Sequence, residues 1–339
     1  MFMGGVKMIK KFKELFKNNP SVFYAMSIAA TWAGGNSLII GMTTAKETGI
    51  VPFILWAIGN TLAPIVFGLL ALRIPKMQKV MDSKVIEVFL TILCMFQIWL
   101  QMNNIQSILS GTQYISNVAA TIIAIGIAIA FVIIFLKNSF PRNVMTDNYG
   151  WYIVYFLIIV LMILAFIYSG GKINKLPLGQ DKIGDGIKSA ILLIPGCFAY
   201  PVFWKMLKYN EKNEDEVEKV NIEKCFVYGG LLFGLYLVFV FMLALVSFSP
   251  ALELMKAILV VIIASSTLSS FIYSLHCYAG KKIGTILSII TIAVWQLFIP
   301  LGVLNMWSLM STVRLYMIIG AVLVAIIWSV VERRKYERN

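Results

Sequence analysis

Apolar residues fall in ten segments of about 20 residues, the length at which a helix spans the hydrocarbon core of a bilayer. Short polar or charged segments separate them. The ten windows are 20–45, 50–72, 85–110, 115–137, 149–170, 187–208, 223–248, 251–280, 282–304 and 308–331. The pattern predicts an all-α membrane protein with ten transmembrane helices.

Composition agrees with this interpretation and excludes a soluble domain. The chain is 60% hydrophobic and 13% charged, with a mean hydropathy of +0.85. We expect one membrane domain over 20–331 and a basic cytoplasmic tail over 332–339. Residues 6–17 carry lysines on one helical face and apolar side chains on the other, which favours an amphipathic cytoplasmic segment over 1–19, on an anionic membrane surface, over a solvated tail.

The net charge of +13 is distributed as a topology signal, so nucleic acid is not an expected partner. Lys and Arg cluster at both chain ends and after the second, fourth, sixth and eighth windows, and they are absent after the third and ninth. The positive-inside rule then places both termini in the cytoplasm. We expect the membrane to be a plasma (inner) membrane. The segment 170–188 has four lysines on the predicted outer side and contradicts this orientation.

The sequence offers no recognisable catalytic chemistry. Its four cysteines stand singly in apolar segments, without metal-ligand spacing. The apolar segments contain no paired acid and base and no nucleophile with a base. We therefore do not expect an enzyme.

Two of the ten windows are interrupted by helix-breaking residues. The first contains "ATWAGGNSLIIG" (30–41), and the sixth contains "LLIPGCFAYPVFW" (192–204). Each is the first window of a set of five, and breaks at matching positions of two halves point to an inverted-repeat transporter. We expect a 5+5 inverted repeat with broken helices 1 and 6. The alternative is that the glycines allow close helix packing and that Pro195 makes an ordinary kink.

Hydroxyl groups recur in the eighth window. Ser266, Ser270 and Ser274 share a helical face, and Thr267 lies beside them. Such hydroxyls often bond to their own helix, but next to an unwound segment they provide the oxygen ligands that a hard cation prefers.

No acidic residue falls in the middle of a window: Glu47, Glu87, Asp147 and Glu253 all lie near the ends of predicted spans. Because a proton-coupled carrier needs a titratable group inside the membrane, we expect Na⁺ and not H⁺ as the coupling ion. A stripe of amides in the third window, Gln97, Gln101 and Asn104, predicts either an aqueous cavity or interhelical hydrogen bonds.

Four stretches resemble the sodium/solute symporter family. "ATWAGGNSLIIGMTTAKETGIVPFILWAIG" is similar to its first core helix and the following turn, and "NVMTDNYGWYIVYFLIIVLMI" to its fifth helix, which opens with Thr-Asp. "PGCFAYPVFWKML" resembles the sixth and "IIASSTLSSFIYSLHCYAGKKI" the eighth. The resemblance implies the leucine-transporter fold of the APC superfamily, reduced to its ten-helix core.

The resemblance also implies roles for individual residues. Na⁺ would be held by the carbonyls of Thr31, Gly34 and Ile263 and the hydroxyls of Ser266 and Thr267, with Asp147 on the cytoplasmic release route. The residues expected to meet the solute are Gly35, Asn36, Gln97, Gln101, Asn104, Phe198 and Tyr200.

The expected function is Na⁺-coupled symport of a small organic solute, such as an amino acid, carboxylate, sugar or osmolyte, by alternating access. The alternative is a non-transporting membrane sensor or regulatory subunit that uses the same fold to bind a ligand.

Overall fold

The computed structural model describes the whole chain except residues 1–19, 75, 137–139, 213–220 and 337–339. The predicted amphipathic segment 1–19 therefore lies outside the described residues. The described part of the chain is built of helices and contains no strand, which confirms the all-α prediction.

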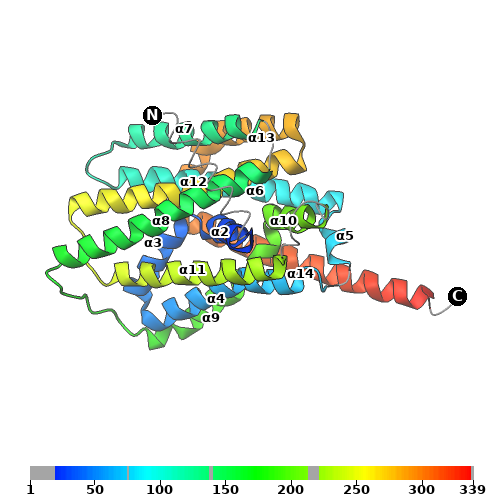
Figure 1. The fold of residues 1–339 in the computed structure, drawn as a ribbon, viewed down its shortest axis with the longest axis horizontal. Helices are drawn as coiled ribbons and strands as arrows, with labels where there is room; N and C mark the ends of the chain where they lie inside the picture. Colours follow the sequence, from blue (N-terminus) through cyan, green and yellow to red (C-terminus); the bar gives the residue numbers. More distant parts are fainter. Residues whose placement is uncertain (1–19, 75, 137–139, 213–220, 337–339) are drawn as a thin grey trace.

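The helices follow the apolar windows (Figure 1). They are, in chain order, α2 (Pro20–Ala33), α3 (Asn36–Thr43), the π-turn η1 (Thr44–Thr48), α4 (Ile50–Leu70), α5 (Met77–Met81), α6 (Lys84–Ser110), α7 (Asn117–Phe135), α8 (Phe140–Tyr168), η2 (Gln180–Lys182), α9 (Ile183–Leu193), η3 (Ile194–Ala199), α10 (Pro201–Lys212), α11 (Ile222–Ala244), α12 (Pro250–Tyr278), α13 (Lys281–Val294), η4 (Trp295–Leu301) and α14 (Gly302–Tyr336).

Seven helical segments in the described residues are long and apolar enough to cross a membrane, or eight if α9 and α10 form one bent span. The protein is therefore an integral membrane protein. The count differs from ten because α2 and α3 are each too short, whereas α13 and α14 run together as one segment, Lys281–Glu332.

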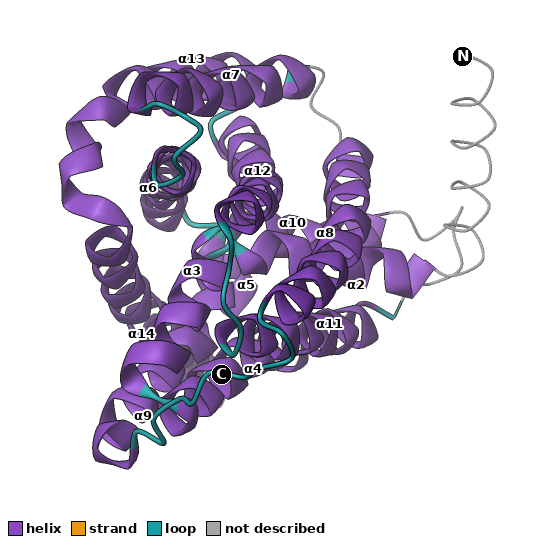
Figure 2. Cartoon of the chain, turned by 90° about the vertical axis from the view of Figure 1, so that its left-hand side faces the viewer, coloured by secondary structure: helices purple, strands orange, loops and turns teal. Residues whose placement is uncertain are grey.

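Helix α12 lies at the centre of the molecule (Figure 2). In its most apolar window 78% of the residues are buried, against 17–50% for the other candidate spans. It packs against α2, α6, α7, α8 and α13. A helix surrounded in this way can carry polar side chains without exposing them to lipid, and Ser266, Thr267, Ser269, Ser270 and Ser274 of α12 are buried.

A second group of helices packs through small residues. Helix α4 lies against α9 and α11, and α11 also packs against α2. A Cβ atom added to Gly59 of α4 would lie 2.6 Å from the Cα of Ala190 in α9. One added to Gly229 of α11 would lie 2.7 Å from a methyl group of Ile28 in α2. These glycines are required by the close approach of the helices.

Both predicted interruptions are present. Between α2 and α3 the backbone leaves the helix at Gly34, which has a φ of +57°. Between α9 and α10 the chain passes through the 3₁₀ segment η3 and an extended Tyr200, and α10 begins at Pro201. The α9 and α10 segments are bent by 55°. Gly34 can adopt the positive φ because it has no Cβ atom, and Pro201 can begin a helix because its missing amide is not needed there.

Candidate cation and solute site

The main chain at the first interruption is bonded to side chains of other helices. The amide of Gly34 donates to the hydroxyl of Thr267 in α12 at 3.0 Å, and the amide of Gly35 donates to the side-chain carbonyl of Gln101 in α6 at 2.9 Å. The Gly34 carbonyl accepts from both the amide and the hydroxyl of Ser37, at 3.1 and 2.8 Å. The break thus joins α2, α3, α6 and α12 by polar contacts.

A buried carboxylate lies beside this break. Asp147 of α8 is 0% exposed. Its Oδ2 accepts from the hydroxyl of Ser27 in α2 at 2.7 Å and from the amide of Asn143 at 3.2 Å. Its Oδ1 accepts from the hydroxyl of Ser266 in α12 at 2.9 Å. Longer bonds come from the hydroxyls of Thr31, Ser269 and Ser270, at 3.4 to 3.5 Å. We call these seven residues the Asp147 cluster.

The carboxyl group of Asp147 has no basic partner among the described residues. No Lys, Arg or His in the part of the chain that the structure describes forms an ion pair with it. A buried charge without a counter-charge costs several kcal/mol, so the group needs either a proton or a cation. The cluster supplies carboxylate and hydroxyl oxygens, which are the ligands that hard cations prefer.

Asp147 lies near the start of its candidate span, Asn143–Tyr168, as expected, but its complete burial was not predicted from the sequence. Helix α8 begins at Phe140, nine residues before the apolar window that starts at 149. The window began late because Asn143, Thr146, Asp147 and Asn148 lower the hydropathy of this first part of the helix. Asn143, Asp147 and Asn148 are fully buried, because this part of α8 faces α2 and α12.

The residues expected to hold the cation fall into two sets of contacts, one around Asp147 and one around Gly34. Thr31 bonds to Ser270 at 3.0 Å and to Asp147. The Thr267 hydroxyl lies 3.4 Å from the Ile263 carbonyl and accepts from Gly34. Ser266 bonds to Asp147. The Gly34 carbonyl, expected as a ligand, already accepts two hydrogen bonds within its own chain segment.

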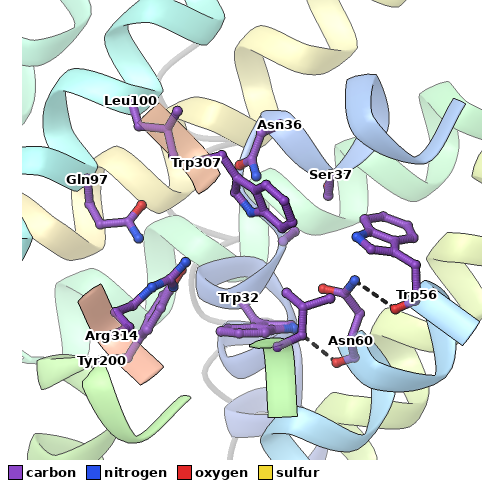
Figure 3. Close-up of a pocket in the computed structure, with 12 residues that line it drawn as sticks. Trp32, Asn36, Ser37, Trp56, Asn60, Gln97, Leu100, Tyr200, Trp307 and Arg314 are labelled. Atoms are coloured by element: carbon purple, nitrogen blue, oxygen red, sulfur yellow. Dashed lines mark hydrogen bonds between the residues drawn. The ribbon is translucent and has the colours of Figure 1, made fainter. Parts of the chain in front are cut away.

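A small cavity lies between the two interrupted helices (Figure 3). Its volume is about 20 Å³, roughly the room that one water molecule needs. The lining residues are Trp32, Ala33, Asn36, Ser37, Trp56, Asn60, Gln97, Leu100, Leu193, Tyr200, Trp307 and Arg314. An organic solute requires this cavity to widen.

Of the residues expected to meet the solute, three line this cavity: Asn36, Gln97 and Tyr200. Gln101 and Asn104 do not line it. Gln101 is bonded to Gly35 and to Asn104, so these residues hold the break in place. The ring of Phe198 packs against Phe67, with centroids 5.1 Å apart, and lies in the aromatic core.

Several polar and aromatic residues of the site were not predicted from the sequence. Ser27 and Asn143 each precede a predicted site residue, Thr31 and Asp147, by one helical turn. That spacing places each pair on one face and could have revealed them. The cavity tryptophans, by contrast, have no distinguishing spacing, since they come from α2, α4 and α14.

The chain matches no protein-family model and no curated protein sequence. The resemblance to the sodium/solute symporters therefore stays a prediction, carried by the four sequence stretches. The geometry of the site is a buried carboxylate among hydroxyls, next to an interrupted helix and a small polar cavity.

Proposed function

We propose that this protein is a secondary active transporter that couples Na⁺ to the movement of a small organic solute. The observation that carries the proposal is the Asp147 cluster, a buried acid whose only described partners are hydroxyls and one amide from α2, α8 and α12. An acid in such a place within a membrane protein marks an ion pathway more often than a structural role.

The oxygen ligands around Asp147 are the basis for proposing Na⁺ as the coupling ion. Hydroxyl groups surround both oxygens of Asp147, and a hydroxyl can donate to an ionised carboxylate while it offers a lone pair to a cation. An ionised carboxylate then needs a counter-cation, and Na⁺ can share the surrounding hydroxyl oxygens. Because Asp147 is buried near the start of its span, the proposal of Na⁺ rests on these oxygen ligands and not on the lack of an acid in the middle of a span.

The packing of the helices supports ten spans in two halves of five. We number them α2 with α3, α4, α6, α7 and α8 in the first half, and α9 with α10, α11, α12, α13 and α14 in the second. In such a repeat, span 6 is the counterpart of span 1, span 7 of span 2, and so on. Span 1 packs against span 7, and the equivalent pair, spans 6 and 2, also packs together. Likewise, span 3 packs against span 4, and span 8 packs against span 9. Equivalent contacts in both halves are expected of a repeat.

Alternating access is the mechanism that this arrangement suits. In transporters of this architecture, one bundle of helices rocks against another around a central site. Here α2, α4, α9 and α11 form one packed group, and α6, α7, α12 and α13 another. The narrow cavity corresponds to a closed state, which opens to admit the solute.

The test is the thermal stability of the purified full-length protein in Na⁺ and in K⁺, with a panel of amino acids, carboxylates, sugars and osmolytes. We expect Na⁺ to stabilise the protein, and one solute class to add stability only when Na⁺ is present. A ligand at 100 times its Kd stabilises by about 2.7 kcal/mol. Asp147→Asn should abolish the effect of Na⁺, whereas Asp181→Asn, an exposed acid in η2, should preserve it.

Equal thermal stability in Na⁺ and in K⁺ would contradict the proposal that the protein binds Na⁺. Solute uptake into proteoliposomes then separates transport from sensing: a Na⁺ gradient should accelerate uptake of the stabilising solute. Binding without any uptake would favour the sensor or regulatory subunit.

A further inference from the structure

A buried arginine faces the cavity from α14. Arg314 is 5% exposed. Its Nε donates to the Met310 carbonyl at 3.3 Å, and its Nη2 donates to the Ser311 hydroxyl at 3.1 Å. These two partners belong to its own helix, and the Tyr200 hydroxyl is a further hydrogen-bond partner, so at least two of the five donor groups of the guanidinium are left for a ligand. Among the described residues no carboxylate forms an ion pair with Arg314.

Two more polar groups turn towards the same cavity. The indole Nε1 of Trp56 is buried and has no hydrogen-bond partner in the described part of the chain. The amide of Gln97, 3% exposed, lies across from Arg314, and Figure 3 shows both groups pointing into the space between the helices. Buried donors without partners are costly, and a ligand that accepts their hydrogen bonds removes that cost.

The surroundings of Arg314 are those of a positive site with aromatic walls. The guanidinium carbon lies 5.7 Å from the centre of the Tyr200 ring. No Asp or Glu is among the residues that line the cavity, whereas Trp32, Trp56 and Trp307 are. A ligand that fits has a negative, planar head for the guanidinium and a small apolar remainder for the tryptophans.

Arg314 also corresponds to Asp147 in the proposed repeat. Asp147 is on span 5 and meets the broken span 1 and span 8. Arg314 is on span 10, and its cavity is lined by the broken span 6, through Tyr200, and by span 3, through Gln97. Each half thus places one buried charge beside its own broken helix, with opposite signs.

We propose that Arg314 binds the carboxylate group of the solute, so that the transported molecule is a small carboxylic acid anion or an amino acid. The guanidinium binds both carboxylate oxygens, and Trp56 and Gln97 offer further donors. The inference rests on the proposed function, because it takes this cavity to be the solute site. It narrows the solute class and excludes neutral sugars.

The test uses defined probes on the purified full-length protein at constant Na⁺ concentration: propionate, L-alanine, the neutral propionamide, and chloride. We expect propionate or L-alanine to raise the melting temperature, and propionamide and chloride to leave it unchanged. If propionate alone acts, the ligand is a simple acid anion. If L-alanine alone acts, it is an amino acid. Stabilisation by chloride equal to that by the carboxylates would overturn the proposal in favour of a general anion site.

The matched variants are Arg314→Gln and Arg73→Gln, the latter removing an exposed arginine that pairs with Glu223. Arg314→Gln should weaken carboxylate binding by about tenfold or more, the effect of losing a hydrogen bond to a charged group, and Arg73→Gln should not. Undiminished binding by Arg314→Gln would overturn the proposal. If that variant does not fold, Arg314→Lys keeps the charge but loses the two-pronged geometry, and the same weakening is expected.

The two proposals fail in different ways. Na⁺ stabilisation that depends on Asp147, without an effect of any carboxylate, would overturn the Arg314 inference and leave the Na⁺ site standing. Carboxylate binding that depends on Arg314 but not on Na⁺ would overturn the Na⁺ coupling and leave the anion site standing.

Discussion

At the residue scale, the site combines hydroxyls that serve different purposes. Ser266 donates to Asp147 at 2.9 Å, whereas Ser274, two turns further along the same face of α12, donates to the Ser270 carbonyl of its own helix at 2.7 Å. The sequence presents the two serines alike. Only the neighbouring helix, which carries the acid, makes one of them a potential cation ligand.

We therefore expect Ser266→Ala to weaken Na⁺ binding by about tenfold, as removal of a hydrogen bond to a charged group does. Ser274→Ala removes a hydroxyl of the same kind and should leave Na⁺ binding unchanged. The measurement is the Na⁺ concentration that gives half of the thermal stabilisation. Equal shifts for the two variants would show that the cluster does not hold the cation.

At the element scale, the interruption of the first span depends on one glycine. Gly34 has a positive φ, and a Cβ atom added there would lie 2.5 Å from the side-chain oxygen of Asn36. The break could be predicted from "WAGGNS" because consecutive glycines weaken a helix. Thr267 and Gln101 were expected near this break, but as ligands of the ion and the solute; that they accept hydrogen bonds from the freed amides could not be predicted, because it depends on how α6 and α12 pack.

Gly34→Ala should lower the free energy of unfolding by about 1–3 kcal/mol, since a left-handed backbone costs about 1–2 kcal/mol for a residue with a Cβ atom. The control is Gly126→Ala in α7, where an added Cβ atom meets nothing within 4 Å. That change should be neutral or stabilise by up to about 1 kcal/mol. Thermal unfolding of the two purified variants measures the difference. A Gly34→Ala variant as stable as Gly126→Ala would contradict the left-handed turn.

The beginning of α8 could not be predicted correctly from the sequence. Hydropathy located most of the helices, because lipid-facing and buried surfaces are both apolar. It placed the start of the fifth window at 149, although the helix begins at Phe140. A polar face that is buried between helices lowers hydropathy just as a loop does, so the sequence did not show that Asp147 is buried.

At the scale of the whole molecule, the orientation in the bilayer stays a prediction of the charge distribution. Both termini are expected in the cytoplasm. The segment 170–188 is the exception, with four lysines on the expected outer side. It is anchored to the start of α4, where the amides of Ile50 and Val51 donate to the carbonyls of Pro177 and Leu178 at 2.9 and 3.1 Å.

Single cysteines test this orientation in a background without the four native ones. We expect a membrane-impermeant thiol reagent, added outside intact cells, to label Gln113→Cys and Lys175→Cys. Lys281→Cys should be labelled only after the membrane is permeabilised. All three positions are exposed. Labelling of position 281 from outside would reverse the orientation, and protection of position 175 would place the lysine-rich segment on the inner side.

The turn at Gly34 gives the first span a pivot. On one side, α2 is fastened to Asp147 through Ser27 and Thr31; on the other, α3 is fastened to α11 by Ser37, whose hydroxyl lies 3.1 Å from that of Tyr236. In the proposed transport cycle, a change of angle at Gly34 would move Asn36 and Ser37 at the cavity while Ser27 and Thr31 keep their bonds to Asp147.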